Sequence, residues 1–143
     1  IVLAVAGKPL AYLHTEKKYK NYVLRYEWKT AKEGRSGVLL HIVEPHRTWP
    51  MCVQVQAQQD SHGRLFTMGG ADGHFIRDKA AQKTVVKWGE WNRTEVVSNH
   101  GKLSVKINGT EVASGESTQK EGVIGIQSEG TEFFFRRMEI KSK

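Results

Sequence analysis

The residues best suited to chemistry lie in the second quarter of the chain, where hydrogen-bonding side chains alternate with apolar ones. His41 ends one such run, which begins just after Arg35. Gln54 and Gln56 lie two apart in the next run, so in a strand they share one face. Amide side chains combine a donor with an acceptor, which suits sugar hydroxyls better than a metal or a phosphate. We therefore expect a sugar-contacting surface on these two runs, with Trp49 between them.

Three of these positions have two interpretations each. His41 titrates near neutral pH and could act as a general acid or base, or it could be a half-exposed histidine at the end of a strand. Glu27 could act as an acid or base, although an ion pair with Arg25 is favoured. Trp49, before Pro50, is either a loop anchor or a platform on which a sugar ring stacks. The stacking role is favoured, because loops at the rim of a sandwich carry specificity.

The dominant apolar period is two, which indicates strands. It is clearest over Tyr22–Lys29, Val53–Gln56, Leu103–Asn108 and Phe133–Ile140. Asn108-Gly109 predicts a tight hairpin, because these residues readily supply the two positive φ angles of a type I′ turn. Many short strands with frequent turns are typical of a sandwich or a barrel. We therefore expect one all-β domain over residues 1–143, with at most a helical turn at Asp78–Val86.

Strand alternation also predicts which side chains share a surface. Val53 and Val55 are expected to point into the core, which leaves Gln54 and Gln56 outside. In the preceding strand Val38 and Leu40 are the expected core pair, which places Leu39 and His41 on the side of the two glutamines. If all these strands share a sheet, they form a groove lined by Arg25, Glu27, His41, Gln54, Gln56 and Gln127.

Composition excludes several other classes of protein. The formal charge is +7, but the 22 Lys and Arg residues are scattered along the chain. Without a dense basic run or an RNA-binding signature, we predict no nucleic-acid partner. No apolar run approaches the roughly 20 residues that span a bilayer. The single cysteine, Cys52, excludes an internal disulfide and a cysteine-rich zinc site, and we expect it to be a packing residue. The six histidines show no ligand spacing, so neither a metal nor another cofactor is expected.

Five segments follow one another in the order of a known family's motifs. They are Tyr12–Trp28, Ser36–His41, Trp49–Gln56, Gly89–Asn92 and Gly125–Arg136. Through these segments, which cover nearly all of the chain, the protein resembles the 3-keto-disaccharide hydrolase family. The resemblance implies a two-sheet jelly-roll sandwich of the concanavalin A-like type. The family carries an additional N-terminal segment, which we expect to be missing or trimmed here.

The resemblance also implies a function. It predicts a bacterial, periplasmic or extracellular enzyme that cleaves 3-keto-disaccharides or 3-keto-glucosides, with a carbohydrate as its partner. A ketone at C3 acidifies the proton at C2, so a base, an acid and a group that polarises the ketone suffice for β-elimination. His41 and Glu27 are the predicted catalytic residues. The predicted substrate-binding residues are Arg25, Arg35, Trp49, Gln54, Gln56, Gln127 and Glu129.

Two departures from the family pattern keep other functions open. Arg35 stands where the family has asparagine, and Gln54 stands where it has glutamate. Ordinary glycosidases need two carboxyl groups beside the scissile bond, and the loss of one leaves no obvious facing pair. The alternatives are a carbohydrate-binding module without catalysis, and a structural or interaction sandwich attached to a larger enzyme.

Overall fold

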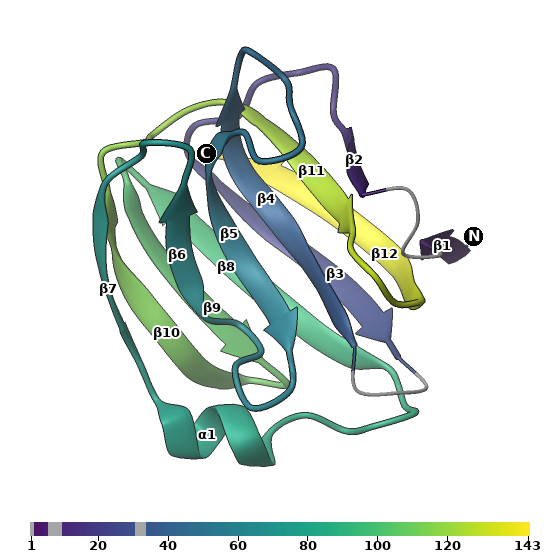
Figure 1. The fold of residues 1–143 in the computed structure, drawn as a ribbon. Helices are drawn as coiled ribbons and strands as arrows, with labels where there is room; N and C mark the ends of the chain where they lie inside the picture. Colours follow the sequence, from purple (N-terminus) through teal and green to yellow (C-terminus); the bar gives the residue numbers. More distant parts are fainter. Residues whose placement is uncertain (1, 6–9, 31–33) are drawn as a thin grey trace.

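The computed structural model describes residues 2–5, 10–30 and 34–143, which form two antiparallel sheets packed face to face (Figure 1). Sheet A has seven strands in the order β1-β12-β3-β8-β9-β10-β7, and sheet B has five in the order β2-β11-β4-β5-β6. The described strands are β1 (Val2–Val5), β2 (Ala11–His14), β3 (Tyr22–Lys29), β4 (Arg35–Val43), β5 (Met51–Gln58), β6 (Leu65–Met68), β7 (Gly73–Arg77), β8 (Asn92–Asn99), β9 (Lys102–Ile107), β10 (Thr110–Ser117), β11 (Val123–Ser128) and β12 (Phe133–Ser142). The predicted all-β jelly-roll sandwich is confirmed.

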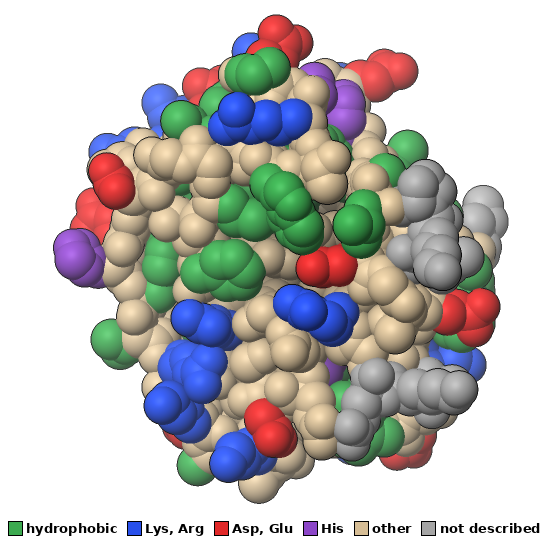
Figure 2. Space-filling model, in the orientation of Figure 1, with side chains coloured by type: hydrophobic (Ala, Val, Ile, Leu, Met, Phe, Trp, Pro, Cys, Tyr) green, Lys and Arg blue, Asp and Glu red, His purple; other side chains and the backbone are tan. Residues whose placement is uncertain are grey.

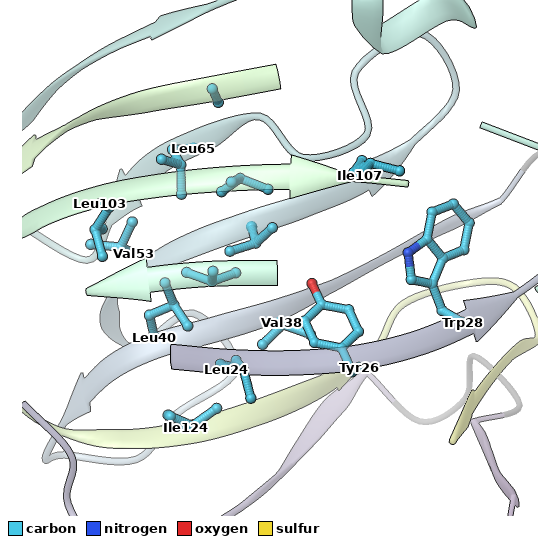
Figure 3. Close-up of a cluster of buried hydrophobic side chains, with 14 of the residues drawn as sticks. Leu24, Tyr26, Trp28, Val38, Leu40, Val53, Leu65, Leu103, Ile107 and Ile124 are labelled. Atoms are coloured by element: carbon cyan, nitrogen blue, oxygen red, sulfur yellow. The ribbon is translucent and has the colours of Figure 1, made fainter. Parts of the chain in front are cut away.

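The core lies between the sheets because each strand turns one apolar face inward. In β3 the buried residues are Tyr22, Leu24, Tyr26 and Trp28, in the alternation that the sequence predicts. Figure 3 shows side chains of β3 on one side of this core and those of β4 and β5 across from them.

The local signals for turns and helix also hold. Asn108 and Gly109 have φ angles of 50° and 86° and join β9 to β10. The helical turn expected after Asp78 is α1 (Lys79–Thr84). The Asp78 carboxylate caps it by accepting a hydrogen bond of 2.9 Å from the backbone nitrogen of Ala81. Within the described residues, no helix has the length and apolar character that crossing a bilayer requires.

The division of strands between the sheets decides which residues can meet. β3 belongs to sheet A, whereas β4, β5 and β11 are neighbours in sheet B. Outward side chains of β3 therefore lie on the opposite side of the sandwich from outward side chains of the other three. The groove that the sequence predicts, which required all four strands in one sheet, does not form.

Candidate functional site

The outer face of sheet B is the surface that its strands turn away from the core. Val38 and Leu40 of β4 and Val53 of β5 belong to the main core, and their neighbours point outward. A second apolar cluster lies on this outer side, formed by Leu39, Ile42, Cys52 and Val123 with Tyr12 and Met68 beside them. Figure 2 views the molecule from this side and shows hydrophobic side chains gathered over the middle of the sheet, with charged side chains among them. The four cluster residues are themselves buried, so Tyr12 and Met68, which are partly exposed, give this face its partly apolar floor.

A pair of glutamine amides spans this floor. The Gln54 side chain of β5 donates a hydrogen bond of 2.6 Å from its Nε2 to Oε1 of Gln127 on β11, and both residues are 3% exposed. The side chain of Gln54 crosses Gly37 of β4, where any Cβ atom would collide with its amide. Gly37 is thus the residue that lets the two amides meet.

The amide pair retains hydrogen-bonding capacity on its solvent side. Oε1 of Gln54 and Nε2 of Gln127 bond no described residue, and neither is among the buried atoms that lack a partner. One is an acceptor and the other a donor, and exchanging O and N in both amides would leave the same combination. A sugar hydroxyl, which both donates and accepts, matches this combination.

A carboxylate and a guanidinium lie beside the amide pair. Glu129 follows Gln127 by two residues, and its Oε1 lies 3.9 Å from the Nη2 of Arg35. The side chain of Glu129 is 16% exposed and that of Arg35 is 60% exposed, so both remain open to a ligand. The structure therefore brings four predicted site residues, Arg35, Gln54, Gln127 and Glu129, onto one face.

Aromatic residues flank the amide pair on both sides. Phe66 of β6 pairs in register with Gln54, and Tyr12 of β2 pairs with Gln127. The hydroxyl of Tyr12 lies 2.8 Å from Nδ1 of His46, which holds the ring in place. Sequence reasoning missed both aromatics, because β2 and β6 are four-residue strands whose sheet partners cannot be read from their own pattern.

Two other predicted site residues lie at the edges of this surface. The amide of Gln56 donates to Oε1 of Gln58 (2.9 Å) and accepts from Oγ of Ser61 (3.1 Å), so it is largely occupied within its own segment. Trp49 is 46% exposed in the loop from β4 to β5. This loop is at the end of the sheet opposite to Arg35, since Val43 pairs with Met51 there.

The predicted position of His41 is wrong. A bulge in β4 gives His41 a φ angle of 56° and reverses the alternation, so the ring turns into the core and is 0% exposed. Its Nδ1 donates to the backbone oxygen of Gln119 at 3.0 Å, which leaves Nε2 to accept from the Tyr22 hydroxyl at 3.0 Å. Burial lowers the pKa of His41, although the bond to Gln119 opposes the shift. The buried imidazole of His41 links β4 of sheet B to Tyr22 of sheet A through the hydrogen bond at Nε2, and it does not reach the outer face.

The predicted positions of Glu27 and Arg25 are also wrong, because β3 places both on the outer face of sheet A. Glu27 accepts hydrogen bonds from Arg136 (2.8 Å) and Arg137 (3.2 Å). Although burial pushes the pKa of Glu27 up, these two arginines hold it below its usual range. Arg25 forms its ion pair with Glu95, at 2.7 Å, and not with Glu27. Glu27 is therefore part of an ion pair, but its partners are Arg136 and Arg137 on the outer face of sheet A.

The residues that the structure describes meet the requirements of neither a metal centre nor a reactive thiol. No group of three or more His, Cys, Asp or Glu side chains that could hold a metal occurs in residues 2–5, 10–30 and 34–143. Cys52 is buried among the outer-face apolar residues, and this burial raises the pKa of its thiol to about 12. A protonated, enclosed thiol serves packing.

Comparisons with known proteins agree with the fold and identify the family. Residues 1–141 match the sequence family of 3-keto-alpha-glucoside-1,2-lyase-like domains. Two candidate glycosyl hydrolases of Parabacteroides distasonis have similar structures. One has a TM-score of 0.75 at 22% identity, and the match covers 99% of this chain and 87% of that protein's chain. The other has a TM-score of 0.73 at 18% identity, and the match covers 99% of this chain and 81% of that protein's chain.

A third similar structure is the carbohydrate-binding module CBM66 of Bacillus subtilis. Its TM-score is 0.64 at 10% identity, over 92% of this chain and 81% of that one. These identities are low, so the structural comparisons support the fold alone. The comparison with curated protein sequences gave no match.

Proposed function

Because the chain belongs to the family of 3-keto-alpha-glucoside-1,2-lyase-like domains, we propose that it binds a glycoside oxidised at C3 and cleaves it by elimination on the outer face of sheet B. The observation that carries this proposal is the position of the Arg35–Glu129 pair beside the Gln54–Gln127 amide pair. Together they offer one carboxylate, one cation and a free donor and acceptor on a single surface.

The chemistry of a 3-keto sugar needs fewer protein groups than ordinary glycoside hydrolysis. A base removes the proton at C2, and the electrons form an enolate with the C3 ketone. The bond from C1 to the leaving oxygen then breaks, which gives an enone and, after protonation, the free alcohol. Only one carboxylate is required, so the neutral Gln54 in place of a glutamate does not block this route.

The residues of the outer face take distinct roles in this scheme. Glu129 is the base, because it is the carboxylate next to the amide pair and a carboxylate can take an acidified C–H proton. Arg35 donates to the ketone oxygen and stabilises the negative charge that develops there. Gln54 and Gln127 hold ring hydroxyls, while Phe66 and Tyr12 pack against the apolar side of the ring.

Turnover of methyl 3-keto-α-glucoside tests the proposal. NMR should show loss of the C2 proton signal and release of methanol with the wild-type protein. Glu129→Gln should lower kcat by at least about a hundredfold while Kd changes little, because a base contributes mainly to the transition state. Glu132→Gln is the matched control, since Glu132 is exposed in the same loop. Equal loss of turnover in both variants, or no loss in Glu129→Gln, would contradict the assignment.

A second candidate function is carbohydrate binding without catalysis. It is favoured by the buried amide pair, which makes the centre of the surface neutral. Binding of the 3-keto-glucoside or of its unoxidised parent without any methanol release would support this function over the lyase.

A further inference from the structure

A basic cleft opens between the two sheets at the edge where β6 and β7 lie. Its volume is about 510 Å³, and its walls include Arg64 from the turn before β6, Arg77 at the end of β7 and Lys79 at the start of α1. The lining residues include no aspartate or glutamate. Figure 1 shows β6 and β7 side by side above α1, and Figure 2 shows Lys and Arg side chains gathered over this part of the molecule.

The three cations of this cleft have no anionic partner within the described residues. Arg64, Arg77 and Lys79 form no ion pair there, and neither do the exposed Arg47 and Arg93 elsewhere in the described chain. Arg77 differs from the other arginines without an ion pair because it is partly buried. The neighbouring Asp78 carboxylate is engaged as the cap of α1. Three cationic side chains around one cleft, with no acidic side chain in its lining, give it a positive potential that attracts an anion.

Arg77 gives the strongest indication of a missing acceptor. Its Nε is buried and has no hydrogen-bond partner among the described residues. Buried donors in folded proteins nearly always have an acceptor, because a buried N–H without one loses the hydrogen bond that it would make to water. An oxyanion in the cleft would supply this acceptor and neutralise the charge at the same time.

The cleft is continuous with the proposed sugar surface through Phe66. This residue lines the cleft and also pairs in register with Gln54. The guanidinium carbon of Arg64 lies 5.5 Å from the centre of the Phe66 ring, so the cation stands over the residue that separates the two regions. A saccharide held at Gln54 would extend over Phe66 toward Arg64.

From this arrangement we infer that the β6–β7 cleft binds the sulfate or carboxylate substituent of an acidic saccharide whose sugar ring lies on the outer face of sheet B. The placement of the ring rests on the proposed function, whereas the anion site rests on the cleft alone. The protein accordingly selects glycosides that carry a negative charge.

Calorimetry with a methyl glucoside sulfated at one position, its unsulfated parent and inorganic sulfate tests the inference. The sulfated sugar should bind at least about tenfold more tightly than the parent, which is about 1.4 kcal/mol, because its sulfate accepts charge-assisted hydrogen bonds in the cleft. Added salt should weaken its binding, since the cleft is open to solvent. Inorganic sulfate that binds as tightly as the sulfated sugar would overturn the saccharide assignment.

Variants separate the cleft from the overall charge of the protein. Arg77→Gln with Lys79→Gln should abolish the preference for the sulfated sugar. Lys102→Gln with Lys106→Gln removes the same charge from exposed positions on β9 and should leave the preference intact. Arg64→Gln alone provides a second test at an exposed residue if the first variant folds poorly. Equal effects of the cleft and β9 variants would show a non-specific charge effect and contradict the inference.

The outcomes also separate this inference from the proposed function. If the neutral 3-keto-glucoside is cleaved but sulfation gives no gain in affinity, the anion site is wrong and the lyase proposal stands. If the sulfated sugar binds through Arg77 and Lys79 but no 3-keto-glucoside is cleaved, the anion site stands and the lyase proposal fails.

Discussion

The side-chain nitrogen of Gln54 lies 2.6 Å from the side-chain oxygen of Gln127, across the strand that separates their own strands. One of the two, Gln54, stands where the family pattern, on the resemblance, has a glutamate. A carboxylate at residue 54 would also accept a bond from the Gln127 amide, but it would place a charge in a nearly closed position. Gln54 instead keeps this buried position neutral.

The first prediction concerns the strength of this amide contact. Gln54→Leu or Gln127→Leu alone should destabilise the fold by about 1–3 kcal/mol, because each leaves the other amide buried with a missing partner. The double variant should cost less than the sum of the two, since both polar groups are then gone. Urea unfolding of all four proteins measures the coupling. Strict additivity would show that the contact contributes nothing.

The second prediction concerns Gly37, over which the Gln54 side chain passes. Gly37→Ala should destabilise the protein and weaken sugar binding, because its Cβ would collide with the Gln54 amide. The same substitution in a Gln54→Ala background should cost much less, since the colliding group is absent. Thermal unfolding compares the two backgrounds. An equal cost in both would mean that Gly37 is required for its backbone and not for this crossing.

The third prediction concerns His41, which the structure places in the core. His41→Ala should lower stability by about 2–4 kcal/mol, because it leaves a cavity and removes the partners of Tyr22 and Gln119. Below its melting temperature, the variant should bind the sugar with unchanged Kd. Calorimetry on the folded variant checks this. A large loss of sugar affinity without loss of stability would contradict this prediction and indicate that His41 contacts the sugar.

The fourth prediction is a loss of stability in acid that depends on His62. This residue stacks on Trp28 with ring centres 4.6 Å apart, and both of its ring nitrogens are buried without a hydrogen-bond partner among the described residues. Burial lowers its pKa from 6.5 to about 4. Between these pH values the unfolded chain binds more protons than the folded one. The contribution of neutral His62 to the free energy of unfolding is therefore fully present above pH 6.5 and decreases as the pH falls toward 4. The loss from His62 alone reaches about 3 kcal/mol.

Unfolding free energies from pH 7 to pH 4 in wild type, His62→Phe and His100→Gln test this dependence. His62→Phe should keep the stacking on Trp28 and show a shallower pH profile. His100, which is exposed in the turn between β8 and β9, should not affect the profile when replaced. Identical profiles in wild type and His62→Phe would remove His62 as a cause.

The fold could be predicted from the sequence because its signals are local. Alternation in Tyr22–Lys29 fixes which side chains of β3 are buried, and Asn108-Gly109 fixes a hairpin without reference to the rest of the chain. The resemblance to the family added the two-sheet jelly-roll type. These features depend on neighbours in sequence, which a single chain displays directly.

The site could be predicted only in part, because it depends on long-range pairing. Gln54 and Gln127 lie on strands of one sheet, as the prediction required, but β3 belongs to the other sheet and places Arg25 and Glu27 there. His41 was misplaced by one bulge, since a single extra residue reverses the alternation for every residue beyond it. Neither the sheet to which a strand belongs nor the position of a bulge can be predicted from the alternation of apolar and polar residues.

The most direct measurement of the central claim is an NMR titration of ¹⁵N-labelled Glu129→Gln protein, which should bind methyl 3-keto-α-glucoside without cleaving it. The side-chain NH₂ signals of Gln54 and Gln127 and the backbone signals of Phe66 and Gly37 should shift together in a saturable manner. The indole signal of Trp91, whose ring packs under Arg136 on the other side of the sandwich, should stay in place. Shifts that centre on Trp91 and Glu27, with the glutamine amides unchanged, would contradict a sugar site on the outer face of sheet B.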